Sequence, residues 1–284
     1  MNYDARSVIV DLTPPALLRA AQKVWRRARG LGFHTWEGSY PSLADVPCDE
    51  DSYDDDEIAQ LVVASTVRHL ESAGATKKII DGTGHLILPV IVAQFLNERL
   101  TVLDFGGGPA VGLFSILDHV PALDLAKFSY VLVETRAVCR AFRTTIKPAL
   151  MNKLGRSCSV EVAEAIPASL GGPLIVNAAG VIHYISDYRD ALSKLASLAP
   201  DFFIVSQTPM TDGPTYARQQ LNTPHKKLAA WVFNRADFLS EMKRLGYRSI
   251  FAVDHDLPLT HKNAPGPSSV VSMVFRPYRQ NPSS

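Results

Sequence analysis

The stretch that decides the fold is "TVLDFGGGPAVGLF", residues 101–114. Apolar residues typical of a buried strand lead into Asp104 and Phe105, three glycines follow, and an apolar pattern at helical spacing begins at Val111. Glycines between a buried strand and a helix let the backbone approach a ligand closely and adopt positive φ. The three glycines therefore predict a cofactor loop, and a tight turn without a ligand is the alternative.

Short apolar runs alternate with helical segments from about residue 85 onward. The expected strands cover residues 100–105, 128–134, 159–165, 173–180, 201–208, 247–254 and 268–277. Runs rich in Val, Ile and Leu suit strands buried on both faces, and the alternation indicates right-handed βαβ units. Because only a loop rich in proline and glycine separates the last two strands, we expect them to be antiparallel. The fold class is therefore α/β, a Rossmann-like doubly wound sheet that finishes in an antiparallel pair.

The N-terminal part has a different pattern, which predicts a helical extension over residues 1–84 and a main domain over residues 85–284. Residues 14–30 have the spacing of an amphipathic helix, which we expect to dock on the protein rather than on a membrane surface. Residues 32–47 are expected to be irregular. The acidic run 49–57 lacks the glycine of a calcium-binding loop and is expected to supply charge to the start of the next helix, residues 57–74.

Composition excludes several classes of function. The 284 residues carry a net charge of +1, which gives no general electrostatic reason to bind nucleic acid. No apolar run is long enough to cross a bilayer, so no stable membrane insertion is expected, and the N-terminus lacks the pattern of a signal peptide. The three cysteines are scattered, which favours a reducing cytoplasm over a disulfide framework.

The glycine loop itself restricts the cofactor. A dinucleotide loop places a third glycine where this chain has Val111, and the loop contains no lysine to bind phosphates. Asp104 directly precedes the glycines, and Glu134 ends the next strand, where a carboxylate can accept hydrogen bonds from ribose hydroxyls. Two carboxylates would repel a pyrophosphate, whereas S-adenosylmethionine offers an ammonium, a sulfonium and a ribose diol.

At these residues the chain resembles class I S-adenosylmethionine-dependent methyltransferases. The matching pieces are "VLDFGGG", Glu134 and "IVNAAGVIHYISD", within residues 85–276. More narrowly it resembles a methyltransferase family often encoded near surface-polysaccharide genes, through "GFHTWEGSYPS", "QTPMTD", "RQQLNTP" and "AAWVFNRADF". The resemblance implies a seven-stranded sheet with a reversed last strand. One departure is Ala110, which stands where these families usually carry another glycine.

Taken together, the loop and the resemblance give a set of expected cofactor-binding residues. These are Asp104, Phe105, Gly106, Gly107, Gly108, Glu134, Thr135, Glu164, Ala165, Asn177 and Ala178. No metal site is expected, because the acids and histidines at 254–261 match no ligand spacing.

Candidates for chemistry follow the fourth and fifth strands. His183 is a possible general base with Tyr184 beside it, although it could equally be a helix-start residue that bonds backbone or cofactor. Asp187 is expected to cap a helix. Thr208, at the end of its strand, could orient an acceptor. His225 is a second possible base, or part of a solvated cluster.

Two further segments are expected to contact the acceptor. Residues 211–231 form a long polar segment that includes Gln219 and is expected to be a functional or mobile loop. Trp36 and Tyr40 either form a lid over the cofactor or fill the core under a loop.

The sequence therefore predicts a cytoplasmic S-adenosylmethionine-dependent methyltransferase that yields S-adenosylhomocysteine. Its acceptor is expected to be a small molecule, with a sugar or sugar-derived intermediate suggested by the resemblance alone, and the protein could be a homodimer. Two alternatives stay open. One is a cofactor-binding scaffold of the same fold without catalysis, and the other is an oxidoreductase that uses a nicotinamide dinucleotide.

Overall fold

The computed structural model describes residues 35–49, 86–154, 159–223, 226–255 and 260–278. It also describes residues 54, 56, 59, 60, 63, 66 and 67. The helix expected over residues 14–30 lies outside the described residues, as does His225. Of the helix expected over residues 57–74, the described positions 59, 60, 63, 66 and 67 are helical.

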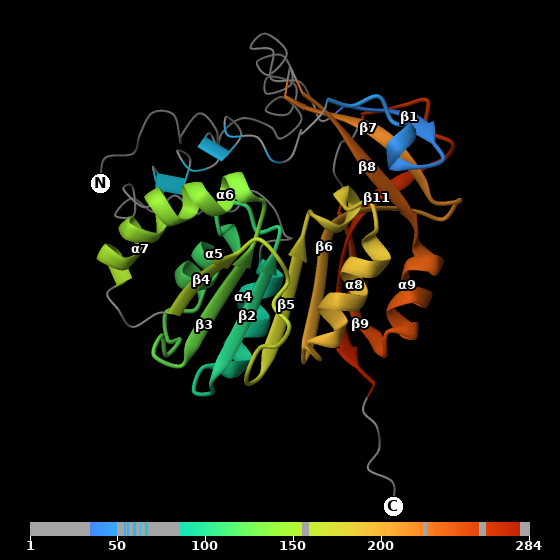
Figure 1. The fold of residues 1–284 in the computed structure, drawn as a ribbon. Helices are drawn as coiled ribbons and strands as arrows, with labels where there is room; N and C mark the ends of the chain where they lie inside the picture. Colours follow the sequence, from blue (N-terminus) through green and yellow to red (C-terminus); the bar gives the residue numbers. More distant parts are fainter. Residues whose placement is uncertain are drawn as a thin grey trace, which may run out of the picture.

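The centre of the molecule is the expected doubly wound sheet (Figure 1). Its strands are β2 (Leu100–Phe105), β3 (Phe128–Val133), β4 (Ser159–Ala163), β5 (Leu174–Ala179), β6 (Phe202–Thr211), β9 (Tyr247–His255) and β11 (Ser268–Pro277). They lie in the order β4-β3-β2-β5-β6-β11-β9, and β11 is antiparallel to both of its neighbours. The Rossmann-like seven-stranded sheet with a reversed last strand is confirmed.

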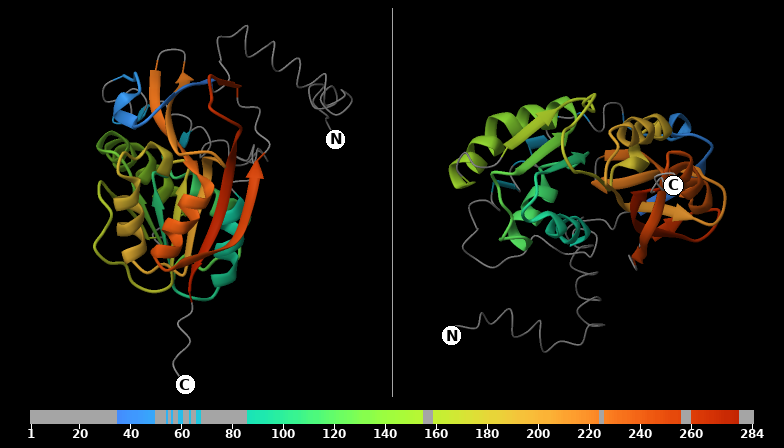
Figure 2. Two further views of the ribbon diagram at one scale, coloured as in Figure 1. Left: turned by 90° about the vertical axis from the view of Figure 1, so that its right-hand side faces the viewer. Right: turned by 90° about the horizontal axis from the view of Figure 1, so that it is seen from below.

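Helices cover both faces of this sheet, and Figure 2 shows α8 and α9 on the face opposite α4. One face carries α4 (Ile87–Val92), α5 (Val111–His119), α6 (Arg136–Ala141), a π-helical turn (Phe142–Ile146) and α7 (Lys147–Leu154). The other face carries α8 (Tyr188–Ser197) and α9 (Arg235–Arg244). Asp187 caps α8 as expected, because its side chain accepts a hydrogen bond from the Asp190 amide.

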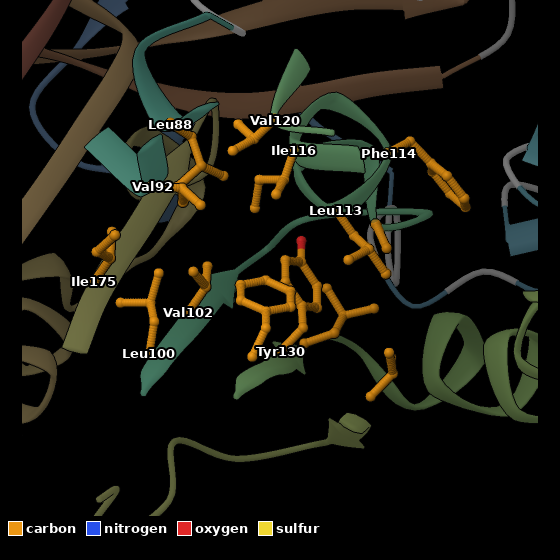
Figure 3. Packing of buried hydrophobic residues seen from close by; sticks show 14 of the residues in the cluster. Leu88, Val92, Leu100, Val102, Leu113, Phe114, Ile116, Val120, Tyr130 and Ile175 are labelled. Atoms are coloured by element: carbon orange, nitrogen blue, oxygen red, sulfur yellow. The ribbon is translucent and has the colours of Figure 1, made fainter. Parts of the chain in front are cut away.

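Each face of the sheet has its own hydrophobic core. On the α4–α5 side, Leu88, Leu113 and Ile116 pack against strand residues such as Val102 and Tyr130 (Figure 3). Successive apolar side chains of the strands point alternately to the two cores, so the strands are buried along almost their whole length.

The segment expected to be a long loop is instead a β-hairpin. Strands β7 (Tyr216–Thr223) and β8 (Lys226–Asn234) pair with each other, and β8 joins the central sheet beside the end of β6. The expectation was wrong because pairing with β1 and β8 satisfies the backbone of this polar segment and buries several of its side chains. Gln219 and Gln220 are both buried there.

The N-terminal segment expected to be irregular also contains a strand. β1 (Thr35–Tyr40) pairs antiparallel with β7 and parallel with the short β10 (Thr260–Lys262), and a 3₁₀ turn (Leu43–Asp45) follows it. These strands extend the sheet to eleven strands within the described residues. Figure 1 shows β1, β7 and β8 above the carboxyl ends of the central strands.

The acidic run contacts the main domain at two places. The Asp49 carboxylate accepts a hydrogen bond of 2.8 Å from the Lys227 amide in β8. Asp54 accepts 2.8 Å from the Ala137 amide in the first turn of α6. We expected the run to serve the helix that follows it, but these acids bind other elements, and Asp54 lies beside the end of β3.

Candidate active site

The glycine loop joins β2 to α5 and is shaped by absent side chains. Gly106 and Gly108 have φ values of 65° and 56°, the left-handed region that favours glycine. A Cβ on Gly106 would collide with Val181, and one on Gly107 would collide with the Asp104 carboxylate. A Cβ on Gly108 would meet nothing within 4 Å, so this part of the backbone faces open space.

A cavity of about 210 Å³ lies against this loop. It is lined by Leu88, Asp104, residues 106–109, Val111, Gly112, Asn177 and Ala179. Most of the lining comes from the glycine loop and the start of α5. Asp104, Asn177 and Ala179 come from the carboxyl-terminal parts of β2 and β5, where ligands of doubly wound sheets bind. The glycines thus give a ligand direct access to the backbone.

Asp104 is buried beneath the loop with a fixed carboxylate. Its Oδ1 accepts 2.7 Å from Nδ2 of Asn177, and its Oδ2 accepts a short hydrogen bond from the Tyr130 hydroxyl. Burial raises the pKa of Asp104 to about 6, although both hydrogen bonds favour the charged form. Gly112 leaves room for this pair, because a Cβ there would lie 2.8 Å from Asp104 Oδ2.

Glu134 lies at the end of β3 and binds the glycine loop. Its Oε1 accepts 2.7 Å from the Gly108 amide, and its Oε2 accepts 2.8 Å from the Thr135 amide. Burial raises its pKa, and the nearby Asp54 contributes in the same direction. Each carboxylate oxygen keeps a second lone pair, so Glu134 can still accept hydrogen bonds from hydroxyl groups of a ligand.

Ala110 has a backbone conformation that favours glycine. Its φ and ψ are 64° and 41°, which is left-handed, and it is fully buried at the N-cap of α5. Its methyl group packs in the core on the α4–α5 side, away from the lining of the cavity. The alanine therefore adds backbone strain without lining the cavity.

The remaining expected cofactor residues differ in their surroundings. Asn177 supports Asp104, whereas Ala178 is fully buried in the core on the α8–α9 side, against which Phe105 packs. The Thr135 hydroxyl is buried without a hydrogen-bond partner among the described residues. Glu164 and Ala165 directly follow β4 and are exposed, and Glu164 forms ion pairs with Arg136 and Arg143 on the surface.

His183 lies in a 3₁₀ turn (Ile182–Tyr184) after β5, close to the glycine loop through Val181. Its ring is buried, and its Nδ1 has no hydrogen-bond partner among the described residues. Burial, assisted by the nearby Arg218, lowers the pKa of His183 to about 3. The Tyr184 hydroxyl donates 2.7 Å to Oε1 of Gln220 in β7.

Trp36 and Arg218 complete the surroundings of His183. The Trp36 ring lies 6.4 Å from the His183 ring, and the Arg218 guanidinium lies 3.2 Å from the centre of the Trp36 ring. Both side chains are almost fully buried, and burial lowers the pKa of Arg218 to about 9. The structure thus brings Trp36, His183 and Tyr184 together in one buried cluster, in which Trp36 fills the core, and the lid and the base stay predictions.

Other expected residues lie elsewhere. Tyr40 packs beside Val46 on the opposite face of the β1–β7 pair, and the Gln219 side chain donates to the Pro47 carbonyl on that same face. Thr208 is fully buried within β6, which continues to Thr211, and its hydroxyl donates 3.2 Å to the Ser206 carbonyl. The expectation that Thr208 ends its strand was wrong, because β6 continues as the partner of β11.

Sequence reasoning missed Tyr216, Arg218 and Gln207. Tyr216, Arg218 and Gln220 alternate along β7 and so face the same side, a signal that could be read once the segment is recognised as a strand. Gln207 has a φ of 53° at an irregularity in the pairing of β6 and β11, next to Gly180. Such irregularities often lie beside functional sites.

The described part of the chain contains no group of three or more His, Cys, Asp or Glu side chains arranged to hold a metal ion. Asp254 instead pairs with Arg235, and His255 lies 2.6 Å from the Ser272 hydroxyl. None of the helices in the same residues has the length and apolar character needed to cross a membrane.

The order and directions of the central strands decide the fold class. The fold is Rossmann-like. Several solved structures are similar to this chain. A 1,6-didemethyltoxoflavin-N1-methyltransferase from Burkholderia thailandensis, solved with S-adenosylhomocysteine, is 15% identical over 78% of this chain and 89% of its own, with a TM-score of 0.45. The glycopeptide N-methyltransferase MtfA, solved with S-adenosylmethionine, is 12% identical over 75% and 98%, with a TM-score of 0.44.

A third structure is an S-adenosylmethionine-dependent methyltransferase from Clostridium acetobutylicum. It is 9% identical over 75% of this chain and 98% of its own, with a TM-score of 0.45. At these identities the likeness concerns the fold alone. No protein-family model matches the sequence, and no curated protein matches it.

Proposed function

We propose that this protein is an S-adenosylmethionine-dependent methyltransferase that acts on a small molecule. The observation that carries the proposal is the pair of carboxylates around a bare glycine loop. Asp104 lies below the loop, and Glu134 is bonded to the Gly108 amide at its edge. A cationic amino-acid end and a ribose diol suit these two carboxylates, and a pyrophosphate does not.

The residues present fit this cofactor. The open face of Gly108 and the cavity beside Asp104 provide space where a side chain would interfere. Asp104 would bind the methionine ammonium and Glu134 the ribose. When bound, S-adenosylmethionine supplies a methyl group on a positively charged sulfur, and S-adenosylhomocysteine is the product.

The chain's own share of the reaction is to orient the acceptor, exclude water and accept a proton where one is released. His183 is the candidate for the last role because of its position after β5. Its pKa of about 3 keeps the imidazole neutral but makes it a weak base in the free protein, so this role requires a bound ligand that raises the pKa. Trp36 lies beside His183 on β1. The division into an N-terminal helical extension or lid, residues 1–84, and a methyltransferase domain, residues 85–284, stays a prediction.

No feature of the described residues distinguishes an oxygen acceptor from a nitrogen acceptor, so the proposal includes both O- and N-methylation. A sugar acceptor and a link to polysaccharide genes stay predictions from the resemblance. The cytoplasmic location and the homodimer likewise stay predictions.

The test is calorimetric titration with S-adenosylhomocysteine. We expect micromolar binding by the wild type and a loss of about 10- to 100-fold for Glu134→Ala, because hydrogen bonds to a charged group contribute about 1.5–3 kcal/mol. Glu161→Ala, an exposed acid in β4, is the matched control and should bind as the wild type does. Absence of binding by the wild type, or tighter binding of NADH, would contradict the proposal.

A further inference from the structure

One face of the β7 strand meets the turn that carries His183, and four side chains gather there. Tyr216 and Arg218 come from β7, Trp36 from the neighbouring β1, and His183 from the turn after β5. We refer to these four residues as the β7 cluster. Each of them is at most 5% exposed, so the cluster is enclosed.

Two polar atoms of the β7 cluster indicate a missing occupant. Nδ1 of His183 and the hydroxyl of Tyr216 are both buried, and neither has a hydrogen-bond partner among the described residues. Leaving a buried polar group unsatisfied costs about 1–3 kcal/mol, and such groups in folded proteins are normally paired. Two of them in one enclosed cluster suit a polar ligand that accepts from Tyr216 and bonds to His183.

The charge of the cluster restricts the chemistry of that ligand. The Arg218 guanidinium lies over the Trp36 ring, with its carbon 3.2 Å from the ring centre. Burial disfavours the charged form of both Arg218 and His183, as their lowered pKa values show. A bound anion would stabilise the charged forms of both residues and so offset the desolvation penalty. A guanidinium binds carboxylate and phosphate oxygens with two parallel hydrogen bonds.

The position of the cluster connects it to the proposed reaction. Val181, two residues before His183, lies directly against Gly106 of the glycine loop. The cluster therefore borders the cofactor loop from the side of β5. Resting on the proposed methyltransferase function, we infer that the β7 cluster binds an anionic group of the methyl acceptor, a carboxylate or a phosphate, with Arg218 as the residue that determines this specificity.

The test uses three sugar probes on protein saturated with S-adenosylhomocysteine. Glucuronate carries a carboxylate, glucose 6-phosphate carries a phosphate, and glucuronamide is the uncharged match of glucuronate. We expect calorimetry to show that the wild type binds at least one of the two anions at least tenfold more tightly than glucuronamide. The preferred anion then identifies the charged group. Equal binding of the amide, or no binding of either anion, would overturn the inference.

Variants separate recognition from folding. Arg218→Gln should reduce affinity for the preferred anion at least tenfold, and Arg218→Lys should reduce it less. Tyr216→Phe should weaken anion binding severalfold without lowering the thermal stability of the free protein, because its buried hydroxyl has no hydrogen-bond partner to lose among the described residues. Arg248→Gln, an exposed arginine in β9, is the control and should bind as the wild type does.

Affinity for S-adenosylhomocysteine is measured separately in every variant, since the Arg218 and Tyr216 variants should retain it. If the protein binds the anion but not S-adenosylhomocysteine, with the anion then titrated into the free protein, the methyltransferase proposal is refuted and the anion site is retained. Cofactor binding with an anion affinity that Arg218→Gln and Tyr216→Phe both leave unchanged would refute the anion site alone.

Discussion

Nδ2 of Asn177, at the end of β5, donates a hydrogen bond of 2.7 Å to Oδ1 of Asp104, at the end of the adjacent β2. The two residues are direct partners in the parallel ladder, so the register of the sheet fixes this contact. Together with the Tyr130 hydroxyl it holds a carboxylate under the glycine loop, in a place where burial opposes its charge.

Replacing that carboxylate should stabilise the protein and impair its function. Burial raises the pKa of Asp104 from 3.8 to about 6. The folded state therefore holds the proton more tightly than the unfolded state, and stability falls by about 3 kcal/mol as the pH rises through this window. We expect Asp104→Asn to increase the free energy of unfolding at pH 7.5 by about 1–3 kcal/mol in urea titrations.

The stabilisation should disappear below about pH 4, where the wild-type carboxyl is protonated in both states. The asparagine can keep both contacts, because its amide accepts from Asn177 and donates to the Tyr130 oxygen. Binding of S-adenosylmethionine should nonetheless fall at least tenfold, since its ammonium loses a charged partner. A variant less stable than the wild type at pH 7.5 would contradict the role of burial.

Gly107 should tolerate no side chain. A Cβ at this position would overlap the Asp104 carboxylate and crowd Leu132. We expect Gly107→Ala to lower the free energy of unfolding by about 1–3 kcal/mol and to abolish calorimetric binding of S-adenosylhomocysteine. Gly171→Ala is the matched control, because a Cβ there meets nothing within 4 Å and the residue is exposed. Wild-type binding by Gly107→Ala would show that the loop is displaced from Asp104.

Ala110→Gly should change stability little, because two effects oppose each other. The left-handed backbone costs an alanine about 1–2 kcal/mol, whereas the buried methyl contributes about 0.8 kcal/mol and glycine adds entropy to the unfolded chain. We expect the free energy of unfolding from urea titrations to change by less than about 1 kcal/mol, and the affinity for S-adenosylhomocysteine to stay unchanged. A large gain in that affinity would mean that the Ala110 methyl does restrict the cofactor site.

His183 should stay neutral in the folded protein down to acidic pH. Burial and Arg218 lower its pKa from 6.5 to about 3, so stability is fully present above pH 6.5 and is lost as the pH falls below it. Imidazole nitrogen shifts measured by NMR should show no protonation of His183 at pH 5. In Arg218→Gln its pKa should rise, because a neighbouring positive charge is removed. An ordinary titration near pH 6.5 in the wild type would show that the ring is solvated.

Much of the fold follows from local patterns in the sequence. Runs of Val, Ile and Leu that end at Asp104 and Glu134 placed β2 and β3 to within a residue, and the glycines placed the loop between β2 and α5. Such runs can be recognised from neighbouring residues alone, because a strand buried on both faces needs apolar residues at every position. The position of a carboxylate at a strand end therefore predicts its place at the edge of the sheet.

The segment around Arg218 could not be placed in the same way. Its run of polar side chains also suits a solvated loop, and only pairing with β1 and β8 makes it a buried strand. Likewise Trp36 and His183 are far apart in the chain and meet only because β1 folds back over the end of β5.

By itself, the sequence determined the order of strands and helices in the seven-stranded central sheet, the glycine loop and the two carboxylates beside it, because backbone conformation and apolar periodicity depend on neighbouring residues. The tertiary structure alone decided which polar side chains are buried together, and hence the pKa values of Asp104, His183 and Arg218. The reason is that desolvation depends on every element packed around a group, and those elements come from distant parts of the chain.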